Sequence, residues 1–169
     1  YEISECLVGS EMCIRDRLGA QAWVKAHKDK LPKIANLFNR DGGPEPPVGI
    51  SVPQAMYDDF VKISEPIQKI RPDYPFEVKV REPRKRPTRM GGTDASVFAI
   101  EGVPTLGFTT EDFKGYDFDY GEIWHTERDL YTKNIPEYQE HTATVTAIIA
   151  LGVANLDKQL SREGLYTEE

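Results

Sequence analysis

The chain has 169 residues and a formal net charge of −7, with 28 acidic against 21 basic side chains. An acidic balance argues against general nucleic-acid binding, which requires a basic surface. No apolar run approaches the roughly 18–20 residues of a membrane span. A chain of this length is sufficient for one sizeable hydrophobic core, so we expect a single domain.

Residues 1–17, YEISECLVGSEMCIRDR, contain both cysteines but show no usable hydrophobic period. Three glutamates interrupt any signal-peptide core, and Cys6 and Cys13 are too far apart for a CxxC pair. The string LVGSEMCIRDR resembles the translation of a transposase-type sequencing adapter, and YEISEC resembles a flow-cell primer end followed by an index barcode. We therefore expect a non-native leader, joined to a domain whose true N-terminal part has been lost.

Residues 18–169 alternate between helical and strand patterns. Helices are predicted where apolar residues recur at spacings of three and four, and strands where short apolar or alternating runs end at glycine or proline. The predicted elements are a helix over 18–31, a strand over 33–41, a proline-rich loop over 44–53, a helix over 53–70, a strand over 76–80, a short helix over 93–102, a buried strand over 103–108 and a long helix from Pro136 to about Leu160. This alternation predicts an α/β layered domain with a substantially parallel sheet.

Local signals support two of these helices. Thr93 or Asp94 suits the N-cap of the helix over 93–102, and Gly102 suits its end. Pro136 suits the first position of the long helix. The remaining histidines, His27 and His141, lie on predicted helices and are expected to be surface or interface groups.

Three segments carry the residues best suited to chemistry: NRDGG (39–43), GGTDASVFAIEGVP (91–104) and IWHTERD (123–129). Each places a carboxylate or an imidazole near a predicted strand end or loop start, where active sites of open α/β sheets gather. Asp41 and His125 offer the oxygen and nitrogen donors that zinc accepts. These residue types make Asp41 and His125 candidates for a metal site.

Taken singly, each of these residues also has a structural explanation. An aspartate before Gly-Gly, such as Asp41, is commonly a turn former. Asp94 alone suits an N-cap, and His125 directly precedes the capping-box pattern Thr126-x-x-Asp129. Periodicity does not decide between these interpretations.

The order of the segments is more specific. Together with LGAQAWVKAH (18–27), they resemble the C-terminal half of the co-catalytic dizinc exopeptidases, the aminopeptidase, carboxypeptidase Q and glutamate carboxypeptidase relatives of peptidase clan MH. In that family such a helix follows a Glu-Glu pair, and a strand then ends in a metal-binding Asp. A Gly-Thr-Asp motif and a His-Thr-x-x-Asp loop come later. The resemblance covers residues 18–160 and implies a three-layer α/β/α fold with a mixed, largely parallel sheet, its N-terminal part missing.

Site residues follow from this resemblance position by position. Asp41 matches the ligand of one zinc ion and His125 the ligand of the other. Asp94 matches an Asp that supports the site without binding metal. Ala95 stands where many aminopeptidases have His, whereas the carboxypeptidase Q branch also has Gly-Thr-Asp without it.

The resemblance implies hydrolysis of terminal peptide bonds, in peptide or dipeptide substrates, by water bound between two zinc ions. A glutamate would act as general base. That residue and the remaining ligands are expected before Leu18, so the polypeptide itself is predicted to be inactive although its intact parent is an enzyme. The resemblance is compatible with a homodimer, and it favours secretion or the periplasm.

Two other groups of residues have open interpretations. The basic run Lys79, Arg81, Arg84, Lys85, Arg86, Arg89 is predicted to be a solvated loop rather than a nucleic-acid site, with a narrower alternative that Arg84, Arg86 or Arg89 borders the substrate cleft. Tyr116, Tyr120 and Trp124 are candidates for a substrate pocket beside His125 or for loop anchors. Alternative functions are a catalytically dead binding domain of this fold and a glutaminyl cyclase-like enzyme with a single zinc ion.

Overall fold

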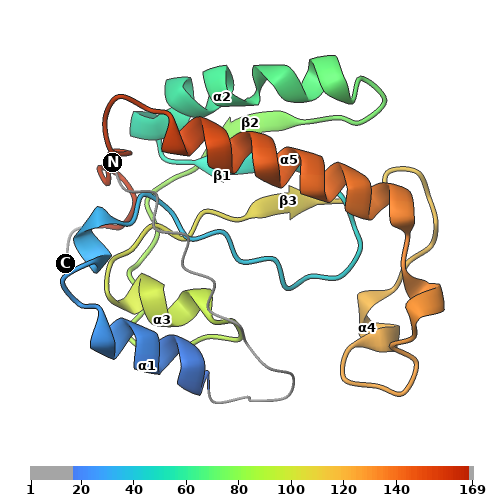
Figure 1. Cartoon of the computed structure of the whole chain (residues 1–169), viewed down its shortest axis with the longest axis horizontal. Helices are drawn as coiled ribbons and strands as arrows, with labels where there is room; N and C mark the ends of the chain where they lie inside the picture. The colour runs from blue at the N-terminus through green and yellow to red at the C-terminus, as the bar shows by residue number, and fades with distance from the viewer. Residues whose placement is uncertain (1–16, 168–169) are drawn as a thin grey trace.

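The computed structural model describes residues 17–167 (Figure 1). The predicted leader, residues 1–17, lies outside the described residues apart from Arg17. The elements are, in chain order, α1 (Leu18–Ala26), the 3-10 turn η1 (Leu31–Lys33), β1 (Pro47–Val52), η2 (Gln54–Met56), α2 (Tyr57–Ile70), β2 (Glu77–Val80), α3 (Ala95–Ile100), β3 (Phe108–Thr110), α4 (Tyr120–Ile123), η3 (Tyr131–Lys133) and α5 (Pro136–Ala154). None of these helices is both long and apolar enough to cross a membrane.

The three strands form one mixed sheet in the order β2-β1-β3. The β1–β2 pair is parallel, with Ile50 opposite Val78, and the β1–β3 pair is antiparallel, with Ile50 opposite Phe108. The predicted α/β class and mixed sheet are therefore confirmed, and one of the two strand pairs is parallel.

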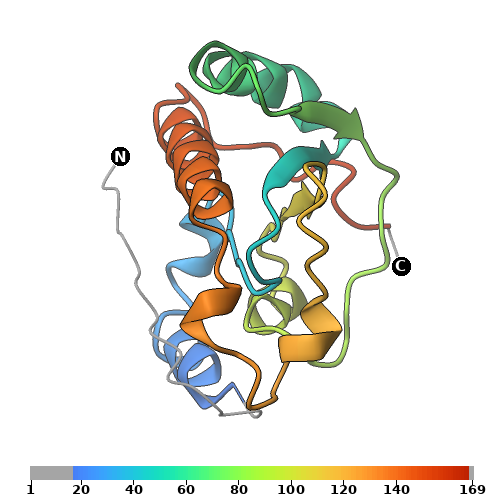
Figure 2. The same cartoon turned by 90° about the vertical axis from the view of Figure 1, so that its right-hand side faces the viewer.

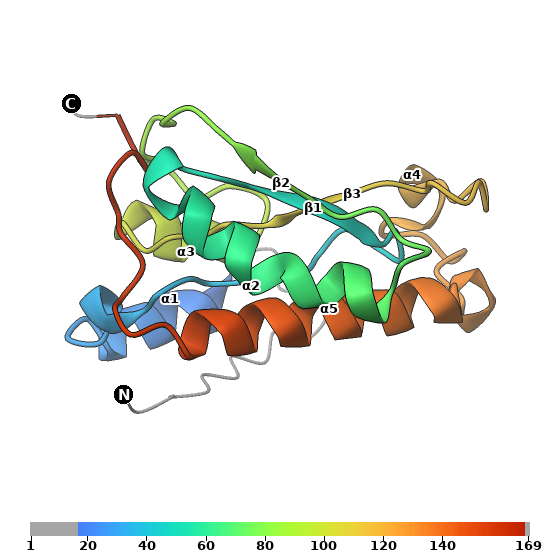
Figure 3. The same ribbon diagram turned by 90° about the horizontal axis from the view of Figure 1, so that it is seen from above.

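The two long helices, α2 and α5, run side by side over one face of the sheet, as Figure 3 shows. Their apolar positions and those of β1 meet in the main core. This core consists of Ile50, Val52, Met56, Phe60, Ile63, Ile67, Leu106, Val145, Ile149, Leu160 and Leu165. The helices pack closely because Gly152 has no side chain: a Cβ atom there would lie 2.3 Å from Cγ2 of Ile63.

A second, smaller core lies beyond the β3 side of the sheet, where α1 packs against α3 (Figures 1 and 2). Its buried members are Ala20, Val24, Leu31, Val97, Phe98 and Val103. The indole of Trp23 covers it, 5.5 Å from the ring of Phe98. This packing fixes α3, and with it the segment that precedes α3, against α1.

The strand predicted over 33–41 is wrong, because residues 34–41 form no regular element. The segment is nevertheless tied to residues 104–106. The backbone N–H of Leu37 donates to the carbonyl of Pro104 (2.9 Å). The Asn36 amide donates to the carbonyl of Leu106 (3.2 Å) and accepts from its N–H (2.8 Å). One backbone hydrogen bond and the Asn36 side chain thus join this segment to residues 104–106, in place of the hydrogen-bond ladder of a paired strand.

The central strand, β1, lies instead in the segment predicted to be a proline-rich loop. Its first residue is Pro47, a position that proline tolerates because the missing N–H is lost only at the strand end. The buried strand predicted over 103–108 is shifted, since β3 begins at Phe108, although Val103 and Leu106 are buried as expected.

The helices follow the predictions more closely. The helix predicted over 18–31 ends at Ala26. Pro136 occupies the first turn of α5 as expected, and α5 ends at Ala154 rather than near Leu160. The expectation that His141 is a surface or interface group is wrong, because its side chain lies on the buried face of α5 and is fully buried.

Candidate functional site

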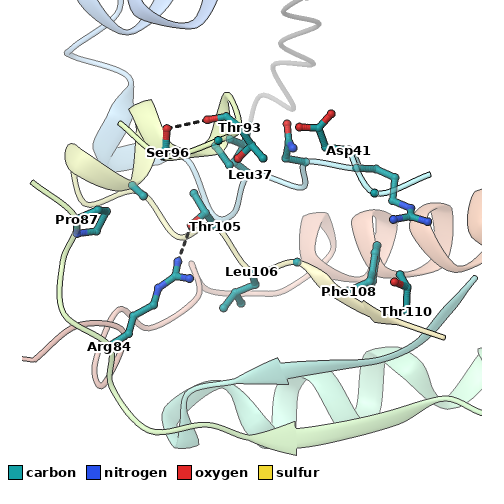
Figure 4. Close-up of a pocket in the computed structure, with 18 of the residues that line it drawn as sticks. Leu37, Asp41, Arg84, Pro87, Thr93, Ser96, Thr105, Leu106, Phe108 and Thr110 are labelled. Atoms are coloured by element: carbon teal, nitrogen blue, oxygen red, sulfur yellow. Dashed lines mark hydrogen bonds between the residues drawn. The ribbon is translucent and has the colours of Figure 1, made fainter. Parts of the chain in front are cut away.

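The segments that carry the three motifs surround one pocket with a volume of about 760 Å³ (Figure 4). Its walls come from residues 37–42, 84–87, 91–99, 105–110 and 120–124. Parts of NRDGG, of GGTDASVFAIEGVP and of the loop before His125 are therefore brought together by the fold. The sequence predicted their relationship only through the family resemblance.

Asp41 lies in the lining, on an exposed loop that is held by its neighbours. The Arg40 guanidinium donates to the carbonyl of Gly43 (2.6 Å) and to that of Glu45. Partial burial lowers the pKa of Arg40, with the Glu45 carboxylate opposing the shift. Gly43 has φ +75°, and a Cβ atom there would lie 3.0 Å from the Tyr120 ring, so glycine suits both the backbone and the space. These contacts hold the loop, and Asp41 lies near Thr93 at the edge of the pocket (Figure 4).

The segment 91–104 contributes residues on both sides of Asp94 to the lining, but Asp94 itself is not a lining residue. Asp94 occupies the N-cap position of α3 as predicted, but its side chain makes no capping hydrogen bond. The half-buried carboxylate also has no ion pair with any other residue in 17–167. Gly102 ends the helix with φ +79°, and the N–H of Val103 bonds back to the carbonyl of Phe98, which confirms the predicted glycine C-cap.

His125 follows α4, whose first turn is capped by the Asp119 carboxylate. The residue is exposed and has φ +56°, in the left-handed region that a non-glycine residue seldom occupies. Its ring lies 4.7 Å from that of Trp124, which lines the pocket, whereas His125 itself lies just outside the lining. The Thr126 hydroxyl accepts from the N–H of Arg128 (3.2 Å), but residues 127–130 form no helix, so Thr126-x-x-Asp129 does not act as a capping box.

Two of the three aromatic candidates line the pocket. Tyr120 and Trp124 belong to the lining. Tyr116 does not, because its hydroxyl bonds to the Glu137 carboxylate and its ring meets that of Tyr138 edge-on at 5.2 Å. The structure thus places Tyr116 at the start of α5 rather than beside Asp41.

Residues that the sequence did not single out complete the pocket. Thr105 and Leu106, in the segment between α3 and β3, belong to the lining, and so does Arg40, the neighbour of Asp41 in the chain. No pattern in the sequence marks Thr105 or Leu106, since their position depends on the irregular course of residues 103–107. Arg84, one of the three arginines considered for the cleft, lines the pocket, but Arg86 and Arg89 do not.

The donor types here fit zinc, but their number does not. A tetrahedral zinc site takes four ligands, or three and a water. Within residues 17–167, no group of three or more His, Cys, Asp or Glu side chains is placed to hold a metal ion. The described residues therefore do not form a complete zinc site, and no catalytic step through a metal is derived from them.

Comparisons with known proteins agree with this fold. The crystal structure of a peptidase M28 precursor from Shewanella amazonensis SB2B superposes with a TM-score of 0.62 at 22% sequence identity, which shows a shared fold. The match covers 86% of this chain and 30% of that protein, so the chain spans about a third of its length. No curated protein matches the chain. The model of peptidase family M28 matches residues 16–149, most of the sequence, and the chain therefore belongs to peptidase family M28.

Proposed function

We propose that residues 18–169 are part of the catalytic domain of a zinc-dependent exopeptidase, with Asp41 and His125 each providing one ligand to a different zinc ion. The observation that carries the proposal is the convergence of the motif segments on one pocket. Family membership supports peptide hydrolysis. Asp94 is assigned to support the site without binding metal because its Gly-Thr-Asp motif matches the family pattern.

The described residues have defined tasks in this proposal. Asp41 presents a carboxylate on a loop held by Arg40 and Tyr120, and the left-handed backbone at His125 turns its imidazole out of α4. In a complete site, two zinc ions supply an acidified water. The described residues, 17–167, do not provide the remaining ligands or the general-base glutamate. We propose that these residues precede Leu18 in the intact protein.

The polypeptide as it stands is accordingly proposed to be inactive. Calorimetric zinc titration of the 169-residue chain is expected to show no tight two-site binding. Stoichiometric uptake of two zinc ions would contradict the assignment of one ligand to each ion.

Activity is tested on a longer protein in which the upstream coding sequence is restored. It is expected to hydrolyse terminal peptide bonds, to lose this activity on chelation and to regain it with zinc. Asp41→Asn and His125→Ala are expected to remove the activity, whereas His27→Gln, a matched control at the end of α1, retains it. Hydrolysis that persists in both site variants would contradict the proposal. A restored protein that binds peptides without hydrolysing them would favour the catalytically dead binding domain.

The finer assignments follow the sequence resemblance. The Gly-Thr-Asp motif with Ala95 favours a carboxypeptidase Q-like relative over the aminopeptidases that have His at this position. Comparing peptides blocked at the amino end with peptides blocked at the carboxyl end distinguishes the two. The secreted or periplasmic location also remains part of the proposal.

A further inference from the structure

The pocket is locally positive in an acidic chain. Its charged lining residues are Arg40, Asp41, Arg84 and Lys85, three cations against one carboxylate, whereas the whole chain has a formal net charge of −7. Arg40 is occupied by two carbonyls of its own loop. The cations available to a ligand are therefore Arg84 and Lys85, in the connection between β2 and α3.

The basic residues of the connection between β2 and α3, residues 81–94, make different contacts. Arg86 donates from Nε to the carbonyl of Ile100 (2.9 Å) and so anchors the segment to the end of α3. Arg84 instead lies in the pocket lining. Its backbone carbonyl accepts from the N–H of Thr167 (3.0 Å), so a short bridge to the C-terminal segment fixes its position.

The guanidinium of Arg84 is held on two sides. Nη2 donates to the hydroxyl oxygen of Thr105 (2.7 Å), and Cζ lies 5.8 Å from the centre of the Tyr166 ring. Within residues 17–167 it forms no ion pair with a carboxylate. Because a guanidinium has five N–H donors in a planar fork, the donors left free suit bidentate binding of a carboxylate.

Arg84 and Asp41 lie at opposite ends of the pocket, with Thr105 and Leu106 between them (Figure 4). A volume of about 760 Å³ is in the range of sites that take small ligands. A ligand that reaches both ends would place one part beside Asp41 and another against Arg84.

We propose that Arg84 and Lys85 form a carboxylate-binding subsite, and that the pocket takes short peptides that present a carboxylate to Arg84. The carboxylate comes either from the peptide's C-terminus or from an acidic side chain. That the ligand is a substrate rests on the proposed function; the binding itself requires neither zinc nor hydrolysis.

Nuclear magnetic resonance titration of the 169-residue chain tests the binding directly. The probes form two pairs: Ala-Ala against its C-terminal amide, and Ala-Glu amide against Ala-Gln amide. The charged member of at least one pair is expected to bind about tenfold more tightly than its neutral partner, and less tightly as salt is added. The pair that shows the preference identifies the source of the carboxylate, and equal affinities within both pairs would overturn the proposal.

Variants assign the preference to Arg84. Arg84→Gln is expected to remove the roughly tenfold difference, and Thr105→Val, which keeps the charge but releases the guanidinium, to reduce it. Arg89→Gln removes the same charge from the same loop, outside the lining, and is expected to retain the difference. Spectra of the free variants verify folding, and Arg84→Lys serves as a second variant if Arg84→Gln fails to fold.

A preference that survives in Arg84→Gln, or in Arg84→Lys at full strength, would contradict a bidentate subsite at this residue. The outcome is separable from that of the proposed function. Carboxylate-dependent binding without zinc-dependent hydrolysis in the restored protein would support the subsite and contradict the proposed peptidase function. Zinc-dependent hydrolysis without carboxylate-dependent binding would support the peptidase function and contradict the subsite.

Discussion

The hydroxyl of Tyr120 donates a hydrogen bond of 3.0 Å to the backbone carbonyl of Asp41. The bond joins two segments that are 79 residues apart in the chain. One carries the proposed ligand of the first zinc ion, and the other leads through α4 to His125. The loop of residues 39–43 and the start of α4 are thus held together by a side chain that itself lines the pocket.

Tyr120→Phe tests this connection. The variant keeps the ring against Gly43 but removes the bond to Asp41, so we expect increased backbone motion of residues 41–43 and 119–125 in relaxation measurements. Because the bond is exposed, the free energy of unfolding should fall by less than about 1 kcal/mol. Tyr131→Phe is a matched control, since that side chain is 89% exposed. Unchanged motion in both loops would show that the bond does not organise the site.

The long helices were predictable because their signals are local. Pro136 at the start of α5 and the apolar spacing of α2 both reflect the helix itself. The central strand was missed because the prolines before it resemble a loop, and only its pairing with β2 and β3 makes Pro47 a strand residue. The pocket lining at Thr105 depends on contacts between distant segments, which a single sequence does not contain.

Close approach between β1 and β2 makes Gly49 a sensitive position. A Cβ atom at Gly49 would lie 2.4 Å from the carbonyl oxygen of Glu77, a backbone atom that cannot move without breaking the parallel pair. Gly49→Ala is therefore expected to lower the free energy of unfolding by about 1–3 kcal/mol in urea denaturation. Gly92→Ala, where the added atom meets open space, should have little effect. Equal stability of the two variants would mean that the sheet accommodates the methyl group.

A hydrogen bond between Tyr138 and Asp112 ties the loop after β3 to α5. The Tyr138 hydroxyl donates to Oδ1 of Asp112 (2.6 Å) and accepts from the backbone N–H of Lys114 (3.0 Å). Burial and this bond raise the pKa of Tyr138 to about 12, and the same bond is the main cause of the lowered pKa of Asp112.

Tyr138→Phe should therefore raise the pKa of Asp112 toward its ordinary value and lower the free energy of unfolding by about 1–2 kcal/mol, because the Lys114 N–H loses its acceptor. Carboxyl chemical shifts of Asp112 followed against pH measure the first effect, and thermal unfolding measures the second. An unchanged Asp112 titration would show that other donors set its pKa.

His141 is a fully buried imidazole on the inner face of α5. Its Nε2 lies 3.0 Å from the carbonyl of Pro47, Nδ1 has no partner within residues 17–167, and the ring stacks on Tyr74 at 3.9 Å. Burial lowers the pKa of His141, and the positive charges of Arg71 and Lys114 add to this effect against the Pro47 carbonyl and Asp73. The folded protein therefore holds this histidine neutral.

The direction of the pKa shift determines how stability depends on pH. Below about pH 6.5 the unfolded chain gains a proton on His141 that the folded chain does not bind. Stability present above that pH is thus lost as the pH falls toward the lower pKa of the folded state. Urea denaturation should give a lower free energy of unfolding at about pH 5.5 than at about pH 7.5. His141→Gln should flatten this dependence and His27→Gln should keep it; an equally steep dependence in His141→Gln would contradict a buried neutral imidazole.

The zinc content of the restored longer protein tests the assignment of Asp41 and His125 most directly. After dialysis against buffer without metal, elemental analysis is expected to find two zinc ions per chain in the unaltered protein and about one in His125→Ala and in Asp41→Asn, because each variant lacks a ligand of one ion. His27→Gln should keep both. Two zinc ions retained in both His125→Ala and Asp41→Asn would show that these residues are not the ligands.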